Sequence, residues 1–202
     1  MNNMDANFDK ELFSGDTPFT IFNRWLDEAK EKEVNDPEAI ALASVDEDGM
    51  PNVRIVLLRV IEDDSFVFFS NYNSKKGSEL FSSKKVAFNI HWKSLRRQIR
   101  VRGLIEKENG SVADNYFNGR QNESKLGAWA SIQSKELENR KILVNRWQKF
   151  RKQFQNKVDR PDFWGGFRIK PLEFEFWAEG QYRLHDRFLW KKTKNHIGWE
   201  VI

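Results

Sequence analysis

Three side chains near the C-terminus have the types and the spacing that anion binding and proton handling require. Arg183, His185 and Arg187 alternate with Leu184 and Asp186. If this segment is extended, the two guanidiniums and the imidazole point to one face, because successive side chains of a strand alternate. A titratable ring between two fixed cations suits an anionic ligand that also exchanges a proton. A solvated edge strand in which Asp186 pairs with an arginine fits the same pattern.

A second candidate anion site lies where a β-rich segment gives way to an expected helix. Phe69 and Ser70 are near the end of the β segment, and Ser74-Lys75-Lys76 opens the helix. Backbone N–H groups at a helix start favour an anion, and two ammonium groups add to that attraction. The spacing is not that of a Walker loop, and no Gly-x-Gly-x-x-Gly is present. A lysine-rich helix start without a ligand is the alternative interpretation.

Two further sets of polar residues could contact a flat, phosphorylated ligand. Tyr116, Arg120 and Ser124 recur every four residues, so one helix would present two hydroxyls and a guanidinium to a single anion. Gly119 argues against a continuous helix, and a loop could align the three side chains instead. The amide of Gln98 can donate and accept, which suits a heterocycle edge such as that of a flavin, although spacing alone favours an ordinary exposed Gln.

Composition narrows the possible classes of protein. The 202 residues include 17 Phe, 8 Trp, 3 His and no Cys. Without cysteine there is neither a disulfide framework nor a thiolate metal site, and three histidines do not predict a metal centre. No long apolar run predicts a membrane span, and the N-terminus is polar rather than signal-like. We therefore expect a soluble, cytoplasmic protein with no membrane partner.

A basic stripe raises the possibility of nucleic-acid binding. Residues 80–105 contain seven Lys and Arg residues, Lys84 and Arg102 among them, and no Asp or Glu. Such a stripe can bind phosphates, or it can be the solvated face of a sheet. Because the net charge is only +4 and no nucleic-acid motif is found, we expect no nucleic-acid partner.

The order of the elements predicts a mainly β protein with flanking helices. Residues 1–16 are expected to be a flexible tail, and residues 17–202 a single domain. Even, short strands favour an antiparallel barrel or sandwich. The expected helices are residues 18–32, 74–83, 111–118 and 134–154. In the last of these, a stripe of Leu143, Trp147, Phe150 and Phe154 is expected to lie in the core, with Ser134 as a possible N-cap. The expected strands are residues 40–45, 52–61, 65–72, 86–92, 97–107, 163–178, 188–191 and 198–201.

Several segments together resemble the FMN-dependent pyridoxine/pyridoxamine 5′-phosphate oxidases over about residues 18–201. Each motif is weak alone, but their order and spacing form a strong signal. The motifs are Arg54-x-Val-Leu-Leu, Ser74-Lys75-Lys76, His91-Trp92-Lys93-Ser94-Leu95-Arg96-Arg97-Gln98, Gly127-Ala128-Trp129-Ala130-Ser131, Phe163-Trp164-Gly165-Gly166-Phe167-Arg168, Glu175-Phe176-Trp177 and Arg183-Leu184-His185-Asp186-Arg187.

The resemblance implies a fold, a cofactor and a reaction. The fold would be an antiparallel, Greek-key FMN-binding split β-barrel of the α+β type. Pyridoxamine or pyridoxine 5′-phosphate would be oxidised to pyridoxal 5′-phosphate, with hydride transfer to FMN, O₂ as acceptor, and H₂O₂ released together with ammonia from the amine. The protein would be a homodimer with the FMN sites at the subunit interface.

The resemblance also implies residue roles. Arg183 and His185 match catalytic positions over the pyridine ring. Positions that bind the substrate, chiefly its phosphate, are Arg59, Tyr116, Arg120 and Ser124. Positions that bind FMN are Arg54, Ile55, Phe69, Ser70, Lys75, Lys76, Gln98, Gln133, Ser134, Trp177 and Arg187.

Position 59 departs from the family pattern. It is Arg where most members have Lys, which keeps the charge and changes the geometry of phosphate contact. Residues 1–16 also lack the arginines and tyrosine with which some members close over the substrate. The alternative function is that of a split-barrel flavin-binding protein or a reductase that acts on another substrate.

Overall fold

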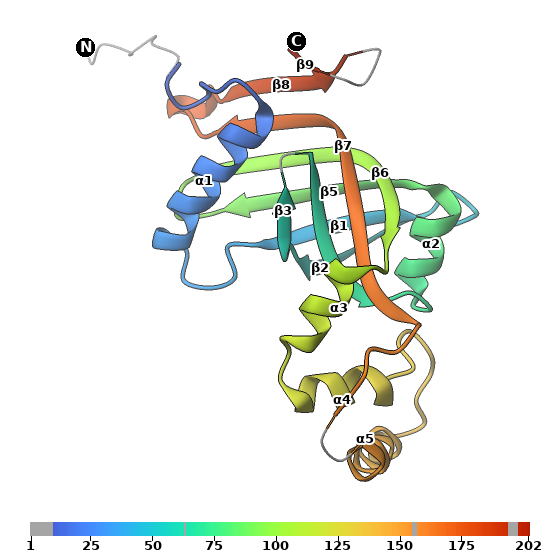
Figure 1. Ribbon diagram of the computed structural model, residues 1–202. Coiled ribbons are helices and arrows are strands. Elements are labelled where there is room, and N and C mark those ends of the chain that lie inside the picture. The colour runs from blue at the N-terminus through green and yellow to red at the C-terminus, as the bar shows by residue number, and fades with distance from the viewer. Residues whose placement is uncertain (1–9, 63, 155–156, 194–197) are drawn as a thin grey trace.

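One antiparallel sheet organises the molecule. The computed structural model describes residues 10–62, 64–154, 157–193 and 198–202. Within these residues the strand order is β2-β1-β5-β6-β7-β4-β3, and β8 and β9 extend the sheet beside β7. The strands are β1 (Ala39–Val45), β2 (Pro51–Leu57), β3 (Val60–Glu62), β4 (Ser65–Asn71), β5 (Lys85–Trp92), β6 (Arg97–Glu108), β7 (Trp164–Ala178), β8 (Asp186–Lys192) and β9 (Trp199–Val201). The sheet curls, as Figure 1 shows, so that β2 also contacts β4, and the expected antiparallel barrel with flanking helices is confirmed.

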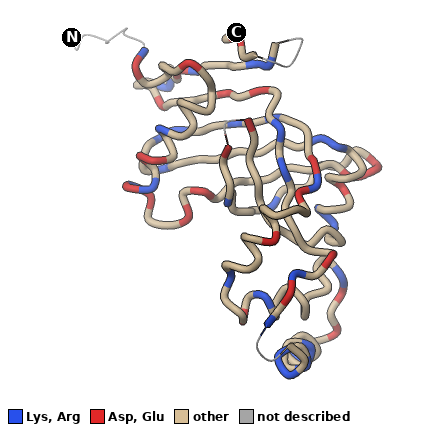
Figure 2. Tube along the Cα trace, in the orientation of Figure 1, with Lys and Arg blue, Asp and Glu red and all other residues tan. Residues whose placement is uncertain are grey.

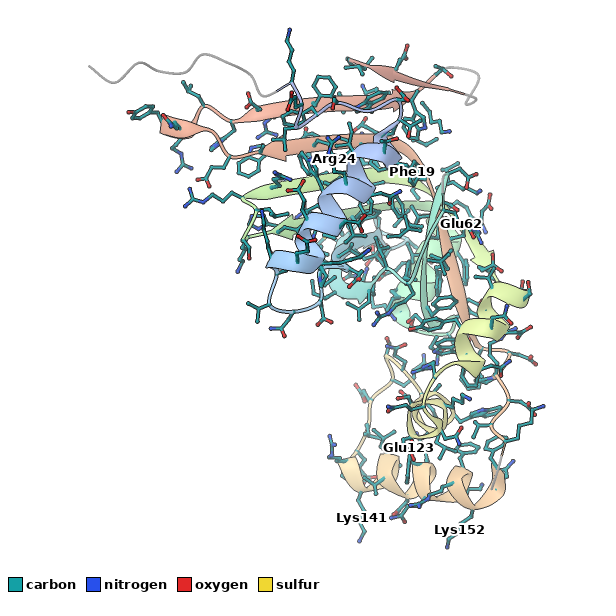
Figure 3. The ribbon with its side chains drawn as sticks, turned by 60° about the vertical axis from the view of Figure 1, so that its left-hand side comes forward. Phe19, Arg24, Glu62, Glu123, Lys141 and Lys152 are labelled. Atoms are coloured by element: carbon teal, nitrogen blue, oxygen red, sulfur yellow. The ribbon has the colours of Figure 1, made fainter. Side chains whose placement is uncertain are left out.

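Helix α1 (Pro18–Lys32) closes the inside of the curled sheet. Thr17 caps its first turn by accepting a hydrogen bond from the Thr20 N–H, and Pro18 stands where no amide donor is needed. Phe19 faces the sheet in Figure 3 and stacks on Phe66 with ring centroids 5.0 Å apart. Trp25 is fully buried. Truncating such a side chain to Ala costs about 3–5 kcal/mol, so this face holds the barrel together.

Helix α2 (Lys75–Ser83) starts almost in contact with the end of β4. Ser74 caps it, accepting from the Gly77 N–H and donating to the Asn71 carbonyl at 2.7 Å. A Cβ at Gly77 would lie 2.1 Å from the Tyr72 carbonyl oxygen, so only glycine permits this approach. The close contact carries the first turn of α2, with Lys76, into the interior.

The helices after β6 differ in part from the expectation. Helix α3 (Ser111–Asn118) has the expected bounds, whereas α4 (Asn122–Ala130) was not predicted. Helix α5 (Arg140–Phe154) begins six residues later than expected. Ser134 is not its N-cap: it lies in a turn with φ of 65°.

The apolar stripe of α5 does not enter the core. No residue of α5 is buried, and the helix packs on α4, where Trp129 stands 5.6 Å from Phe150 and 5.0 Å from Phe154. Lys141 and Lys152 point away from that contact in Figure 3. The stripe therefore makes a peripheral helix–helix contact, because the barrel interior is already filled by aromatic residues of α1 and the sheet.

Part of the expected tail is packed. Residues 1–9 lie outside the described residues, but Phe13 is 2% exposed and stands 5.6 Å from the ring of Trp25. Arg24 donates to the carbonyl oxygens of Leu12 and Ser14 at 2.6 and 2.9 Å. The chain is therefore anchored to α1 from at least Leu12, upstream of the expected domain start at residue 17.

Candidate active site

A cavity of about 500 Å³ lies between the ends of β2 and β4 and the helices α3 and α4. Nine of the residues predicted to bind FMN or substrate line it. These are Ile55, Arg59, Phe69, Ser70, Lys76, Tyr116, Arg120, Ser124 and Gln133. Segments far apart in the sequence thus meet in one place, at a size that suits small ligands.

Lys76 is a buried cation whose hydrogen bonds go to neutral oxygens. Its Nζ lies 2.8 Å from Ser70 Oγ, 3.0 Å from Ser74 Oγ and 3.3 Å from Gln133 Oε1. Burial, and secondarily the charge of Arg54, lower the pKa of Lys76 from 10.5 to about 8. A phosphate would reverse that effect, because an adjacent anion favours the ammonium form.

Arg120 presents an unpartnered donor to the same cavity. Its Nη1 is buried and has no hydrogen-bond partner among the described residues. The guanidinium lies over the Trp164 ring, 4.8 Å from the centroid. Burial lowers the pKa of Arg120. A buried guanidinium nitrogen without an acceptor is costly, and the group that would satisfy it is an anion with several oxygens.

The predicted alignment of Tyr116, Arg120 and Ser124 exists, but not on one helix. Tyr116 belongs to α3, Ser124 to α4, and Arg120 to the short turn between them. All three line the cavity. The doubt about a continuous helix was justified, since a helix–turn–helix brings the three side chains together.

Flat side chains form one wall of the cavity. The rings of Phe69 and Tyr116 stack at 3.9 Å with an interplanar angle of 3°, and Trp164 lies nearly parallel, 5.7 Å from Phe69. The wall therefore presents the edges and faces of aligned aromatic rings beside the two cations. Aromatic surface next to a cation suits a ligand that has both a ring and a phosphate.

Two of the predicted FMN-binding cations stand behind the cavity. Arg54 donates to Glu79 Oε2 at 3.2 Å and to Ser44 Oγ, and Lys75 lies 3.9 Å from Glu79 Oε1. Asn52 also donates to Glu79, which is 4% exposed. Neither Arg54 nor Lys75 lines the cavity, and neither does Ser134.

The other predicted site residues form a separate group on the outer face of the sheet. Gln98, Trp177 and Arg187 are direct cross-strand partners on β6, β7 and β8, so they form one row. The His185 ring stands 4.8 Å from that of Trp177. Arg187 also forms an ion pair with Glu175 at 3.0 Å.

The segment that carries Arg183 is not extended. A 3₁₀ turn, η1 (Gln181–Arg183), occupies it, and Tyr182 and Arg183 have φ of 53° and 66°. The expectation that Arg183, His185 and Arg187 alternate on one strand face is therefore wrong. The reversal after β7 requires a compact turn, and β8 begins only at Asp186.

The two groups lie at opposite ends of β7. Trp164 at its start belongs to the cavity, while Trp177 near its end belongs to the outer row. A strand of 15 residues at about 3.3 Å per residue spans roughly 45–50 Å of chain. Figure 1 shows the ends of β7 beside α3 and beside β8, respectively. No residue of the outer row lines the cavity.

Several cavity residues were not among the predicted site residues. Those omitted are Val56, Leu57, Asn71, Gly127, Ala128, Ser131 and Trp164. All of them except Asn71 fell within recognised motifs, so motif membership was the available signal. Nothing in the residue types alone indicated that they face a ligand.

The basic stripe is largely neutralised by residues from other segments. Arg100 lies 2.8 Å from Glu175, Arg102 3.5 Å from Glu173, and Arg97 2.9 Å from Glu28. The tube in Figure 2 places acidic residues beside basic ones along these strands. This pairing weakens the main observation that favoured nucleic acid.

Neither a metal cluster nor a membrane helix is found in the part of the chain that the structure describes. No group of three or more His, Asp or Glu side chains could hold a metal ion there. No helix there is long and apolar enough to span a membrane.

Comparison with known families identifies the chain. Residues 26–154 match the family described as pyridoxamine 5′-phosphate oxidase, and residues 164–201 match the pyridoxine 5′-phosphate oxidase C-terminal dimerisation region. The chain belongs to the pyridoxamine 5′-phosphate oxidase family. The resemblance stated from the motifs is thereby confirmed.

Curated relatives match over nearly the full chain. A pyridoxine/pyridoxamine 5′-phosphate oxidase of a Ruegeria species is 55% identical over 190 residues, which are 94% of each chain. The enzyme of the same name from Bartonella henselae is 45% identical over 194 residues, 95% of this chain and 94% of the relative.

Solved structures share the fold. PhzG from Burkholderia lata, solved with tetrahydrophenazine-1-carboxylic acid, has a TM-score of 0.89 and 29% identity, covering 98% of this chain and 97% of its own. A pyridoxamine 5′-phosphate oxidase-related, FMN-binding protein from Nostoc punctiforme has a TM-score of 0.71 at 13% identity, covering 94% and 99%. The second likeness concerns the fold alone.

Proposed function

We propose that this chain is an FMN-dependent oxidase that converts pyridoxamine or pyridoxine 5′-phosphate to pyridoxal 5′-phosphate. The carrying observation is a pair of cations, the buried Lys76 and the half-buried Arg120, which line one cavity beside aligned aromatic rings and pair with no carboxylate among the described residues. Two phosphorylated, flat molecules would satisfy both cations. The family names and the relatives' names support the same reaction.

The hydrogen-bond donors that line the cavity fit FMN. When bound, FMN would supply a hydride acceptor that O₂ reoxidises, with release of H₂O₂. We assign its phosphate to Lys76 and Ser70, with Gln133 alongside. Lys75 and Arg54 add positive potential from behind, while Glu79 holds their side chains. Ile55 and Phe69 would contact the cofactor from the cavity wall, and Ser134 from the loop after α4.

The substrate phosphate is assigned to the other end of the cavity. Arg120 would donate its unpartnered Nη1, Tyr116 and Ser124 would donate hydroxyls, and Arg59 would add a second guanidinium. Clamping the phosphate in this way fixes the position of C4′ relative to FMN. Such positioning replaces a bimolecular encounter and supplies a large part of the rate.

We further propose that the site is completed by a second copy of the chain. Within one chain, the end of β7 that is remote from the cavity carries a group of predicted site residues: Gln98, Trp177, His185 and Arg187. These residues can therefore contact the ligands only across a dimer interface. The match of residues 164–201 to a dimerisation region supports this arrangement. The outer face of β2 also supports it, since Val53 and Ile55 are each 66% exposed there.

Spectra and oxygen uptake test the reaction. Purified protein supplied with FMN should show flavin absorbance bands and consume O₂ when pyridoxamine 5′-phosphate is added. A preparation that binds no FMN would contradict the cofactor assignment. One that binds FMN but leaves both B6 phosphates unoxidised would contradict the substrate assignment.

Mixed dimers test the shared site. Lys76→Met and His185→Ala should each be nearly inactive alone. If each site uses Lys76 of one chain and His185 of the other, a mixed dimer keeps one intact site, and random mixing restores about a quarter of the sites. Co-refolded variants that regain no turnover would contradict the interface arrangement.

A second candidate is a flavin enzyme of the same fold with another substrate. PhzG, solved in complex with tetrahydrophenazine-1-carboxylic acid, shares the fold over nearly the full chain. Arg120 distinguishes the two functions where the other substrate carries neither a phosphate nor a carboxylate, because its buried Nη1 then finds no anionic acceptor. Turnover of a phosphate-free ring, unaffected by Arg120→Met, would favour this alternative.

A further inference from the structure

The turn after β7 joins two groups that the sequence places five residues apart. The Gly180 backbone N–H donates to His185 Nδ1 at 3.2 Å. A neutral imidazole carries its one hydrogen on either nitrogen, and the nitrogen that accepts a hydrogen bond cannot be the protonated one. We infer that Gly180 holds His185 as the Nε2-protonated tautomer, so that the ring offers the substrate a hydrogen-bond donor rather than a base.

The backbone of the turn brings the two groups together. Tyr182 and Arg183 both have positive φ, a conformation that residues with side chains rarely adopt, and in succession they reverse the chain. The Trp177 ring, 4.8 Å from that of His185 and tilted by 50°, packs against the imidazole. The orientation of His185 is therefore set by one hydrogen bond and one ring contact.

Only glycine fits at position 180. A Cβ there would lie 1.7 Å from the Leu184 carbonyl oxygen and 2.7 Å from its carbon. The absence of a side chain lets the strand end and the turn approach closely enough for the N–H to reach the imidazole. Gly180 is thus a positioning residue that acts through His185.

The remaining ring nitrogen is available to a ligand. His185 is half-buried, and no hydrogen bond to its Nε2 is found among the residues that the structure describes. An Nε2–H donor would engage an acceptor oxygen on the substrate ring and hold it in place. This last step rests on the proposed function, whereas the tautomer does not.

The tautomer can be measured without turnover. Long-range ¹H–¹⁵N correlation spectra of ¹⁵N-histidine protein loaded with FMN should show His185 with a protonated Nε2 and an unprotonated Nδ1. The chain has three histidines, so the spectrum of His185→Gln assigns the signals by difference. A protonated Nδ1 would overturn the inference whether or not the protein oxidises B6 phosphates.

A pair of glycine variants tests the role of position 180. Gly180→Ala should give mixed His185 tautomers and about a tenfold lower kcat, the value of roughly one hydrogen bond, with FMN affinity unchanged. Gly198→Ala is the control, because its Cβ would meet its nearest atom, in Thr193, at an ordinary 3.6 Å. A single Nε2-protonated tautomer in Gly180→Ala would show that Gly180 does not set it.

A second pair remains informative if Gly180→Ala does not fold. The amide nitrogen of Gln reaches the position of Nε2, and that of Asn the position of Nδ1. His185→Gln should therefore turn over pyridoxamine 5′-phosphate about tenfold faster than His185→Asn. Equal rates, or a faster Asn variant, would overturn the donor role while leaving the oxidase assignment intact.

Discussion

Cations of the same kinds have opposite surroundings in two regions of this molecule. On the outer face of the sheet, Arg100 and Arg102 pair with Glu175 and Glu173 of the neighbouring strand. In the cavity, Lys76 has only neutral hydrogen-bond partners, and Arg120 Nη1 has none among the described residues. The comparison separates cations that pair within the fold from cations whose surroundings suit the anion-binding role proposed for them.

The largest expected effect on activity comes from substitution of Arg120, whose Nη1 has no hydrogen-bond partner among the described residues. Arg120→Met should lower kcat/KM for pyridoxamine 5′-phosphate about 100- to 1000-fold, since it removes charge-assisted donors to a phosphate. The midpoint of thermal unfolding should not fall, because the variant also removes an unsatisfied buried group. Steady-state kinetics and calorimetry measure the two quantities. An unchanged KM would place the phosphate elsewhere.

The next effect concerns the cofactor. Lys76→Met should raise the Kd for FMN about 10- to 100-fold, because the phosphate loses an ammonium partner in a buried site. Titration with quenching of flavin fluorescence measures it. Lys125→Met is a suitable control, since Lys125 is partly exposed and its ammonium group donates, among the described residues, to the Asn118 carbonyl alone. Equal FMN affinities in the two variants would refute the assignment.

The pH dependence of Lys76 gives a second test of the same residue. Its pKa is lowered from 10.5 to about 8, so between these values the unfolded chain holds a proton that the folded, cofactor-free chain does not. Stability therefore rises with pH across that window, and FMN affinity falls as Lys76 loses its charge. Urea unfolding at several pH values should show this rise in the parent and a weaker one in Lys76→Met.

Substitution of a cation that pairs with carboxylates should lower stability and leave ligand binding unchanged. Arg168 is 13% exposed and bonds Glu108 at 2.7 Å, with Glu62 and Ser65 as further partners. Arg168→Gln should cost about 2–3 kcal/mol of unfolding free energy, because it leaves partly buried carboxylates unpaired. FMN affinity and KM should stay at parental values. A folded Arg168→Gln protein that no longer binds FMN would contradict the distinction between cations that pair within the fold and cations proposed to bind an anion.

The smallest effect on stability is expected for an exposed ion pair. Lys170 lies 2.9 Å from Asp64, and its hydrogen bond is the main reason that the pKa of Asp64 is lowered. Lys170→Ala should cost less than about 1 kcal/mol, since solvent screens the pair, and the pKa of Asp64 should rise toward its ordinary value. Urea unfolding at pH 7 and pH 3 measures both, and a loss as large as that of Arg168→Gln would contradict the ranking.

Local sequence was a good guide to elements and a poor guide to charge pairing. The helices expected at residues 18–32 and 111–118 follow from local features, and the structure confirms both with the same bounds. The stripe of residues 80–105 looked unneutralised because its partners, Glu28, Glu173 and Glu175, are distant in the chain. Only strand pairing reveals them.

The candidate site shows the same limit. Family motifs nominated most of the polar cavity residues, whereas residue types alone could not nominate Trp164 or Ala128. The interpretation of residues 183–187 as an extended segment was wrong. It assumed the side-chain alternation of a strand, whereas the chain reversal after β7 requires positive φ at two positions. The apolar stripe of α5 was wrongly assigned to the core. Periodicity indicates that a helix has an apolar face, but it does not indicate which element covers that face.

The sequence by itself determined the family, the antiparallel sheet and the residue types that bind phosphates, because those follow from local pattern and motif order. Tertiary structure alone decided which cations keep a carboxylate partner, and it separated the predicted site into a cavity and an outer row. The physical reason is that burial and pairing depend on distant segments: β7 joins both groups, yet its length keeps them apart within one chain.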